Sequence, residues 1–596
     1  MPAEQQKHNE LFYACKYTPI ELLAGFGATP RIAEADVASF AYADALAHPN
    51  LCGYGKGLIE RLLADDVHEV VLVTCCDVIK RAYDILAGQG HLDFCYLLDL
   101  PHKRGEAERR LFRARLADLA RAYAAYSGRP FDVGAALAAF EPYVPRQDGR
   151  VTLVGAHATG ALLGTVEEDV GVPVENATCT ERHLLVSPPP QLARMAAAGD
   201  CDSCEALGEG GAADPTGLGV GRAGGTLDTF LDWYAGALLD QMPCMRMDDV
   251  SPRAGLVGRP GQRGVVYHTM KFCDYYGFEY AAATREGDMP MVKIETDGTS
   301  QSAGQLKTRL AAFGETLRSH GADRAGEPKK EARPDAPTYV LGIDSGSTST
   351  DAAIVDGNSR VVATAILPTG AKATEAAAKA KEQALAQAGL TAADITLEVS
   401  TGYGRDSIAD ADGSITEITC HARGAHYLMP EARTVIDIGG QDSKVIHLDD
   451  RGGVLNFVMN DKCAAGTGRF LEMMARTLEM SLPEFCETGL AWKHPVHISS
   501  MCTVFAESEI VSLVANDTPT PDVIHGLDES VARKTTMLAR RVHAEPPYLM
   551  TGGVAQNEGV VAALTETLDA PVAVHPDSQL CGAIGAALLG LESLQR

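Results

Sequence analysis

The sequence predicts a mixed α/β protein made of two halves joined by a linker. In the first half, short apolar runs alternate with helical stretches, which is typical of βαβ units around parallel sheets. In the second half, three apolar runs each end in a glycine-bearing turn. Between the halves, residues 319–337 are dense in charge, Pro and Gly without an apolar period. This composition predicts a flexible linker.

Length and composition narrow the class of protein further. The 596 residues suggest about four domains or subdomains. The net charge is −27 and no basic block is present, which argues against a nucleic-acid partner. No run of eighteen apolar residues occurs, and the first residues lack the layout of a secretory signal. We therefore expect a soluble cytoplasmic protein that does not bind a membrane.

Three segments of the first half predict its strands and helices. Each begins with an apolar strand, continues through a turn and leads into a helix; they are residues 68–86, 151–176 and 264–280. We expect one parallel sheet from about residue 65 to 140 and another from about 150 to 320. Residues 199–225 form a Gly-rich stretch that predicts a loop.

The second half contains three turns of similar design. Residues 339–356 and 434–449 each predict a strand, a tight turn of small residues and a returning strand. Residues 546–564 predict a strand, a Gly-Gly pair and a helix that begins near Asn557. Such turns place backbone N–H groups and hydroxyls around an anion. The ordered trio is more specific than any single turn.

This trio resembles the two phosphate motifs and the adenosine motif of the acetate kinase, sugar kinase, Hsp70 and actin superfamily. The resemblance implies two ribonuclease-H-like lobes that close over ATP and Mg²⁺. Asp344 and Asp437 would hold the metal, and Gln441 would position the hydrolytic water; turn-capping carboxylates are the alternative for both aspartates. The implied ATP contacts are Gly346, Ser347, Thr348, Ser349, Gly439, Gly440, Gln441, Gly552, Gly553, Gln556 and Asn557.

Two cysteines of the second half stand just before predicted helices. Cys463 precedes a helix that starts near Thr467, and Cys502 precedes another helical run. Helix N-termini favour thiolates and an anionic cluster. Two cysteines cannot supply a four-cysteine site alone, but a symmetric dimer provides two from each copy and one [4Fe–4S] cluster. The alternative is that both are ordinary buried thiols, which is how we interpret Cys420, Cys486 and Cys581.

The sequence around these cysteines, CAAGTGRF and CTVFAESE, resembles the activators of 2-hydroxyacyl-CoA dehydratases over residues 338–590. In that family, ATP hydrolysis drives an electron from the bridging cluster into a partner. The resemblance implies a homodimer formed through the C-terminal domain, 338–596. It also implies an upstream electron donor such as ferredoxin or flavodoxin.

The first half resembles the dehydratase and benzoyl-CoA-reductase-type subunits. The matching segments are residues 13–32, 51–63, 73–86, 97–103, 176–185, 270–280 and 304–315. The resemblance implies two Rossmann-like subdomains, about 1–145 and 146–318, with an iron–sulfur site in the cleft between them. In the family, three cysteines hold a [4Fe–4S] cluster. Cys52, Cys273 and one of Cys75 and Cys76 match that triad.

Further thiols make the first half similar to the double-cubane cluster proteins, in which two linked cubanes, [8Fe–9S], take six cysteines. The six candidates are Cys52, Cys75, Cys76, Cys179, Cys244 and Cys273. Cys15 competes with Cys244, and Cys179 and Cys244 could equally be core residues. Cys95 lies in an apolar strand and is expected in the core. Cys201 and Cys204 form a C-x-x-C pair whose role stays open.

The combined prediction is an ATP-hydrolysing iron–sulfur oxidoreductase. Electrons would pass from the bridging cluster of the ATPase domain to the cluster of the first half, which would reduce a small molecule. His268, near Cys273, could donate a proton, although a buried strand histidine is the plainer interpretation. The alternatives are a 2-hydroxyacyl-CoA dehydratase or benzoyl-CoA-type reductase with a built-in activator, a sugar or acetate kinase type of phosphotransferase, and an iron–sulfur assembly ATPase.

Overall fold

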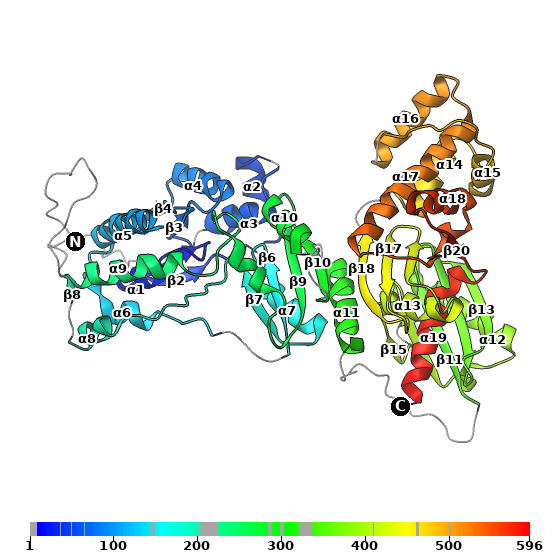
Figure 1. Ribbon diagram of the computed structural model, residues 1–596, viewed down its shortest axis with the longest axis horizontal. Coiled ribbons are helices and arrows are strands. Elements are labelled where there is room, and N and C mark those ends of the chain that lie inside the picture. Colours follow the sequence, from blue (N-terminus) through cyan, green and yellow to red (C-terminus); the bar gives the residue numbers. More distant parts are fainter. Residues whose placement is uncertain are drawn as a thin grey trace. The chain divides into compact units, whose positions relative to one another are not determined.

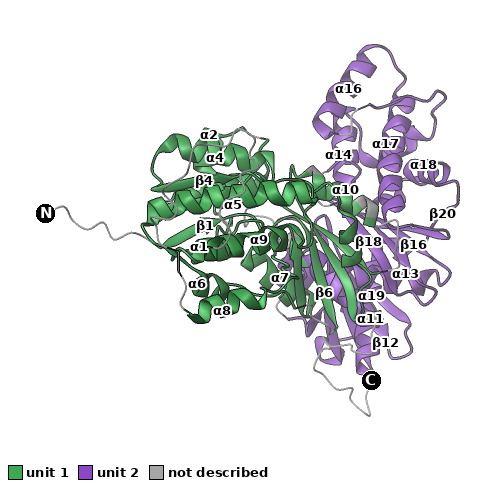
Figure 2. Ribbon diagram, turned by 60° about the vertical axis from the view of Figure 1, so that its left-hand side comes forward, with its two compact units in different colours: residues 1–307 green, residues 308–596 purple. Residues whose placement is uncertain are grey.

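The structure is a computed structural model. It describes residues 9–35, 37–48, 50–64, 66–144, 149–198, 201–202, 225–283, 289–297, 303–320, 337–408, 410–460, 464–499 and 502–595. The chain divides into two compact units, residues 1–307 and 308–596 (Figure 2). Helix α11 (Ala303–His320) spans the boundary between them. The helix includes residues 319 and 320, so the predicted linker starts at least two residues later than expected. Residues 321–336 lie outside the described residues, so the rest of the linker stays a prediction.

The first unit opens with a parallel four-stranded sheet, in the order β2-β1-β3-β4 (Figure 1). Its strands are β1 (Glu10–Tyr13), β2 (Thr29–Ile32), β3 (Glu69–Val73) and β4 (Phe94–Leu98). The sheet therefore starts at Glu10 rather than near residue 65. Strand β3, EVVLV, is buried at every position, as an apolar run in a parallel sheet should be.

Helices surround this sheet and contribute most of its hydrophobic core. They are α1 (Ile20–Ala24), α2 (Ala41–Leu46), α3 (Gly53–Leu62), α4 (Asp77–Gln89), α5 (Glu106–Ser127), α6 (Val133–Ala138), α8 (Pro190–Ala198) and α9 (Thr226–Leu239). Helix α9 comes from much later in the chain and packs against α5. The ring of its Phe230 lies 5.3 Å from the ring of Phe131. The first subdomain thus uses residues from both sides of the predicted boundary near 145.

A second parallel sheet follows, in the order β10-β9-β6-β7. Its strands are β6 (Arg150–Gly155), β7 (Val174–Thr178), β9 (Gln262–Met270) and β10 (Met291–Thr296), and helices α7 (Gly160–Val170) and α10 (Asp274–Ala283) follow β6 and β9. A short pair, β5 (Phe131–Asp132) and β8 (Cys201–Asp202), is antiparallel. The predicted alternation of strands and helices is confirmed. Residues 203–224 of the Gly-rich stretch lie outside the described residues.

The second unit contains two five-stranded sheets with the same topology. The first has the order β13-β12-β11-β14-β15 and the second β18-β17-β16-β19-β20. The strands are β11 (Tyr339–Ser345), β12 (Ser349–Asp356), β13 (Val361–Pro368), β14 (Leu397–Thr401), β15 (Gly413–Ser414), β16 (Thr434–Ile438), β17 (Ser443–Leu448), β18 (Val454–Asn460), β19 (Tyr548–Thr551) and β20 (Val572–Val574). In each sheet an antiparallel meander meets a parallel neighbour. The expected two-lobed α/β architecture is confirmed.

Helices pack on both sheets of this unit. They are α12 (Ala373–Ala388), α13 (Glu417–Leu428), α14 (Gly468–Thr477), α15 (Leu482–Gly489), α16 (Thr503–Ala515), α17 (Thr520–Arg541), α18 (Glu558–Leu568) and α19 (Cys581–Leu594). Helices α13 and α19 cross closely, and glycine at position 585 permits this approach. A Cβ there would collide with the carbonyl oxygen of Cys420. This crossing fixes the position of α13 beside the ends of β11 and β16. Within the described residues, no helix is both long and apolar enough to cross a membrane.

Candidate nucleotide site and thiol cavity

The two predicted phosphate turns of the second unit meet each other. In the first turn the amide of Gly346 donates to the carbonyl of Ser349 over 2.9 Å, and in the second Gly439 donates to Asp442 over 3.0 Å. A Cβ at Gly440 would collide with the hydroxyl of Thr348. The sequence places small residues here because the turns approach more closely than larger side chains allow. Their backbone amides and hydroxyls therefore gather in one place, as anion binding requires.

Asp344 and Asp437 end the equivalent strands β11 and β16 and face one histidine. His421 of α13 places its Nε2 3.5 Å from Asp344 Oδ2 and its Nδ1 3.5 Å from Asp437 Oδ1. The hydroxyl of Thr551 donates to Asp437 over 2.9 Å. The two aspartates thus come together from the two sheets, as predicted. His421 was not predicted, because no local pattern in its helix separates it from a core histidine.

The aspartates sit in a buried charge network. Burial alone would raise the pKa of Asp437, but His421 and Lys444 outweigh burial and lower it to about 2. Lys444 Nζ lies 3.1 Å from Asp437 and 2.8 Å from Asp442. Burial would lower the pKa of His421, yet Asp437 and Asp344 raise it well above its usual value. Carboxylates that already attract cations, next to turn hydroxyls, are the oxygen donors that fit Mg²⁺.

Asp351 on β12 is a third carboxyl in this network. Burial, together with the charge of Asp344, raises its pKa to about 8. Its Oδ2 accepts a hydrogen bond from the Ser349 hydroxyl over 3.2 Å, while its buried Oδ1 has no partner among the described residues. At neutral pH the carboxyl therefore keeps its proton in the folded chain.

Because of Asp351, we expect the metal-free chain to lose stability as pH rises from about 4 to 8. In this window the folded chain holds a proton that the unfolded chain has released, so rising pH favours unfolding by at most about 1.4 kcal/mol per pH unit. Asp351→Asn should reduce this slope, whereas Asp450→Asn, in an exposed turn, should not. Urea unfolding midpoints at pH 6 and pH 8 measure the effect. Equal slopes in wild type and Asp351→Asn would contradict it.

The predicted adenosine motif follows β19. Gly552 has a φ of 81°, and a Cβ there would crowd the carbonyl of Ile438 and the carboxylate of Asp437. Asn557 caps α18 by accepting from the amide of Gly559 over 2.9 Å, so its buried side chain serves the fold. Gln556 bonds to Gln579, and Gln441 is exposed in the second phosphate turn.

The second phosphate turn is also tied to α14. The amides of Gly468 and Arg469, which open α14, donate to the carbonyls of Gly439 and Gly440 over 2.9 and 2.8 Å. Helix α14 starts at Gly468 with Thr467 as its N-cap, as predicted. Cys463 itself lies outside the described residues. Because these two hydrogen bonds join the turn to the first residues of α14, a movement of the turn is expected to move α14, the helix that follows Cys463.

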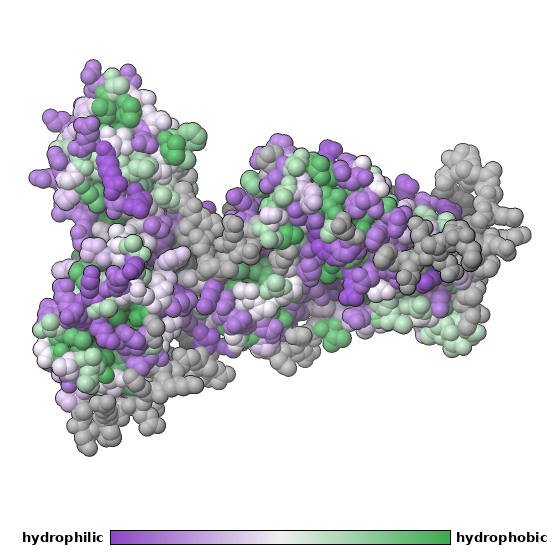
Figure 3. Space-filling model, turned by 180° about the vertical axis from the view of Figure 1, so that it is seen from behind, coloured by the Kyte–Doolittle hydropathy of each residue, from purple (hydrophilic) through white to green (hydrophobic). Residues whose placement is uncertain are grey.

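Cys502 occupies the predicted position at a helix N-terminus. It is the N-cap of α16 and is exposed. Four apolar side chains of α16 are exposed as well: Val504, Phe505, Val511 and Val514. Figure 3 shows apolar patches at the end of the second unit that carries α16. An exposed thiol beside exposed apolar side chains is typical of an interaction surface.

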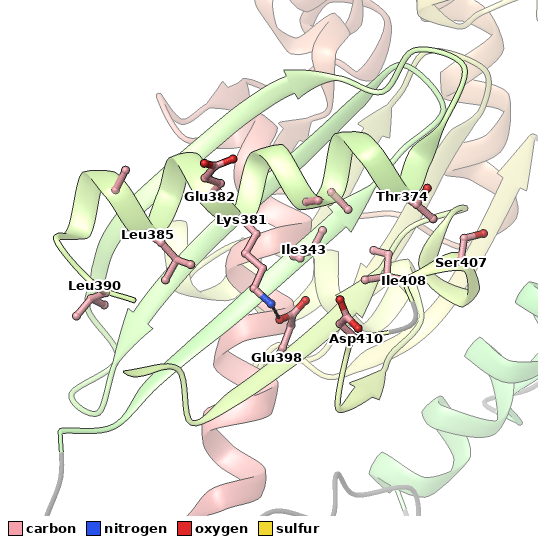
Figure 4. A pocket seen from close by; sticks show the side chains of 13 residues that line it. Ile343, Thr374, Lys381, Glu382, Leu385, Leu390, Glu398, Ser407, Ile408 and Asp410 are labelled. Carbon is pink, nitrogen blue, oxygen red and sulfur yellow. Dashed lines mark hydrogen bonds and ion pairs between the residues drawn. The ribbon is translucent and has the colours of Figure 1, made fainter. Parts of the chain in front are cut away.

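A separate pocket of about 610 Å³ lies between α12 and the face of β11 and β14. Figure 4 shows Lys381 of α12 pointing at Glu398 of β14, with which it forms a partly buried ion pair. Aliphatic side chains such as Ile343, Leu385 and Ile408 provide much of the remaining wall. The residues predicted to bind ATP do not line this pocket, so it is distinct from the phosphate turns.

In the first unit, seven cysteines line one cavity of about 200 Å³. They are the six predicted candidates and Cys15: Cys15, Cys52, Cys75, Cys76, Cys179, Cys244 and Cys273. Most of them follow the carboxyl ends of parallel strands, where open α/β sheets bind ligands. Cys15 follows β1, Cys75 and Cys76 follow β3, Cys179 follows β7 and Cys273 follows β9. The structure thus brings thiols from both subdomains together around one cavity.

Three of these thiols act on one another's ionisation. Hydrogen bonding with Cys15 and Cys76, together with burial, raises the pKa of Cys75 well above the usual value. The hydrogen bond from Cys75, helped by Arg246, lowers the pKa of Cys76 to about 6, and the pKa of Cys15 is lowered as well. Burial instead raises the pKa of Cys52 to about 11.

The donor set of the cavity fits an iron–sulfur cluster better than a single ion. Among the described residues, no group of three His, Cys, Asp or Glu side chains is spaced to hold one metal ion. The thiols instead surround a space, and thiolates around a cavity are the ligands that iron–sulfur clusters use. None of the seven cysteines is in a disulfide.

Other sequence candidates fall outside the cavity. Cys95 lies within β4, as predicted, and packs against the core while staying partly exposed. His268 is buried between the carbonyl of Ala156 and the hydroxyl of Thr296, which suits a strand histidine rather than a proton donor in the cavity. Cys204 lies outside the described residues. Sequence reasoning missed His157 and Arg246, which line the cavity.

Comparisons with known proteins divide the chain in the same way. Residues 341–590 match the family described as "BadF/BadG/BcrA/BcrD ATPase family". Residues 15–147 and 221–317 match "2-hydroxyglutaryl-CoA dehydratase, D-component".

Individual relatives match the second half. The chain is 48% identical to the activator of lactoyl-CoA dehydratase of Anaerotignum propionicum over 43% of its own length and 99% of the relative. It is 45% identical to the (R)-2-hydroxyglutaryl-CoA dehydratase activating ATPase of Acidaminococcus fermentans, over 42% of this chain and 96% of the relative. The chain also resembles the solved structure of component A of the Acidaminococcus fermentans (R)-2-hydroxyglutaryl-CoA dehydratase, with 43% sequence identity and a TM-score of 0.43. The match covers 44% of this chain and 100% of the solved one.

Proposed function

Because the chain belongs to the BadF/BadG/BcrA/BcrD ATPase family through residues 341–590, we propose that its ATPase domain drives electrons into the thiol cavity of the same chain. The observation that carries this proposal is the cavity itself. Seven cysteines surround one space in a unit that is covalently joined to a dehydratase-activator ATPase. A phosphotransferase would have no use for such a cavity, and this disfavours the kinase alternative.

The cysteines present suit two iron–sulfur sites. Cys502 and Cys463, from each of two copies of the chain, would hold a bridging [4Fe–4S] cluster at the ends of α16 and α14. In the first unit, six of the seven cavity cysteines would hold the acceptor cluster, with Cys15 and Cys244 competing for one place. Such clusters, when bound, take up and release single electrons at low potential. An upstream ferredoxin or flavodoxin would supply them.

Nucleotide binding would reach Cys463 through the backbone. The phosphate turn at Gly439 and Gly440 accepts hydrogen bonds from the first amides of α14. Asp344 and Asp437 would share the Mg²⁺ of ATP, and His421 lies between them on α13. Loss of the γ-phosphate would change the charge that these groups face, and a ligand shifts a conformation only through such differences in contact. The turn would then move α14 and the cysteine that precedes it.

The exposed apolar side chains of α16 support transient docking near Cys502. An electron leaves a cluster only when an acceptor comes close, and Val504 and Phe505 stand next to the cysteine. The first unit also exposes aromatic side chains beside Cys273, namely Phe272, Tyr275 and Phe278. Both thiol sites are therefore flanked by apolar surface.

Electron transfer that requires ATP tests this function directly. The full chain, purified without oxygen and reduced by an artificial donor, should show no electron in the acceptor cluster until ATP and Mg²⁺ are added. Freeze-quenched EPR spectra before and after ATP measure the change, and a nonhydrolysable ATP analogue is the control. Transfer at equal rate without ATP, or material that contains no iron, would refute the proposal.

Iron content separates two versions of the acceptor. The match to the dehydratase D-component favours a single [4Fe–4S] cluster and acyl-CoA dehydration, whereas seven clustered thiols favour a double cubane. About eight iron atoms per acceptor unit would support the double cubane, and about four would support the dehydratase type. Iron that leaves the chain for a client protein during turnover would instead indicate an assembly ATPase.

A further inference from the structure

The wall of the thiol cavity contains a guanidinium, that of Arg246, whose charge acts on the thiol of Cys76. Arg246 follows Cys244 and lines the cavity. Its guanidinium lies over the ring of Tyr275, with Cζ 4.0 Å from the ring centroid. Among the described residues, no carboxylate or other hydrogen-bond acceptor pairs with this guanidinium. Five N–H donors therefore remain available at the cavity.

Arg246 is the group of the cavity wall that favours an anion. Among the described lining residues it is the only lysine or arginine and Asp77 is the only carboxylate, while Cys76 is an acidic thiol whose pKa Arg246 helps to lower. Asp77 opens α4 and is exposed. A guanidinium stays charged at any pH that the fold survives, and stacking on an aromatic ring leaves its edge free for planar, bidentate recognition of a carboxylate.

A second unpaired group lies in the same wall. His157 is 2% exposed, and its ring lies against that of Tyr54, with centroids 4.3 Å apart and the planes tilted by 36°. Its Nδ1 is 2.9 Å from the hydroxyl of Thr180, while its buried Nε2 has no partner among the described residues. Buried polar atoms are almost always paired in folded proteins, so an unpaired nitrogen in a cavity wall points to a bound molecule.

We propose that the thiol cavity binds a small substrate whose carboxylate is held by the Arg246 guanidinium and whose second polar group accepts a hydrogen bond from His157 Nε2. With the Thr180 hydroxyl donating to Nδ1, Nε2 carries the hydrogen that the substrate accepts. The binding of this molecule does not depend on the proposed function. Only its role as the substrate that is reduced rests on that function.

The size of the cavity limits the part of the substrate that enters it. Sites for drug-sized ligands measure roughly 300–1,000 Å³, whereas this cavity measures about 200 Å³. The part that carries the carboxylate and the reacting bond is therefore compact.

Calorimetric titration of the oxygen-free full chain with acetate, and with acetamide as the neutral isostere, tests the site. Acetate should bind at least about tenfold more tightly than acetamide, because only acetate pairs with a cation. Arg246→Gln should weaken acetate binding by about tenfold to hundredfold, and Arg246→Lys by less. Arg81→Gln, which removes an exposed arginine from α4, is the matched control and should change nothing.

Several results would overturn the inference. They are equal binding of acetate and acetamide, no acetate binding by wild type, or unchanged acetate binding in Arg246→Gln. Loss of iron from Arg246→Gln without loss of acetate binding would also overturn it, because Arg246 would then support the cluster instead. His157→Gln provides a second variant, expected to leave acetate binding and iron content unchanged but to weaken the binding of glycolate, whose hydroxyl oxygen can accept a hydrogen bond from Nε2.

The proposed function and the anion site fail in different ways. Acetate binding is therefore also measured on the iron-depleted chain, alongside ATP-driven reduction of the complete chain. Arg246-dependent binding without any electron transfer would keep the anion site and reject the redox function. Electron transfer without acetate binding would reject the site and keep the function.

Discussion

A Cys502→Ser variant should hydrolyse ATP but deliver no electron to the thiol cavity. Cys502 caps α16 on the surface, and serine is a poor replacement because clusters prefer the softer thiolate. We expect the bridging iron to be lost and ATP-dependent reduction of the acceptor to fall to background. Iron analysis and EPR after ATP addition measure both effects. The aspartates of the nucleotide site are unchanged, so ATP hydrolysis should persist.

Cys486→Ser provides the matched control for this variant. Cys486 lies in α15 of the same unit, is only partly buried and follows none of the predicted cluster motifs. Its replacement should leave iron content and electron transfer unchanged. Normal electron delivery by Cys502→Ser, or equal losses in both variants, would be incompatible with a bridging role for Cys502.

Asp437→Asn should lower ATP hydrolysis by about 10² to 10³. The substitution removes a buried negative charge while leaving the Thr551 hydroxyl a hydrogen-bond acceptor in place. His421 and Lys444 then lose the carboxylate that they face. A metal that depends on carboxylates from both lobes would bind weakly. Phosphate release at saturating ATP and Mg²⁺ measures the loss.

Folding controls keep this second prediction interpretable. Removing one partner from a buried ion pair costs about 3–5 kcal/mol, so the melting temperature of the variant should be measured with its activity. Asp450→Asn changes the same residue type in the exposed turn between β17 and β18 and should keep wild-type hydrolysis. A folded Asp437→Asn chain with wild-type ATPase activity would remove Asp437 from the metal site.

Sequence reasoning located the parts of the site that depend on local structure. The turns after β11, β16 and β19 are short and rich in glycine, so their pattern is visible in the chain. Cys52, Cys75, Cys76 and Cys273 could be placed because each stands at an end of a strand or helix.

The remaining site residues depend on tertiary packing. His421 lies on α13, which packs closely against α19, and reaches two aspartates that come from two different sheets. Arg246 and His157 come from different segments and line the same cavity only through the fold. Spacing along the chain could not decide whether Cys15 or Cys244 is the cluster ligand, because both line the same cavity although they are far apart in the sequence. The strand at Glu10 is four residues long, too short for a periodic pattern.

The late position of helix α9 has a consequence for how the chain is made. Phe230, Leu231 and Tyr234 of α9 complete the core around β1 and α5, yet they are synthesised about a hundred residues after that helix. Domains usually fold as units while the chain leaves the ribosome. Here the opening subdomain must wait, with apolar surface exposed, until translation has passed residue 239. Its cysteines thus meet one another, and any iron, only after most of the first unit exists.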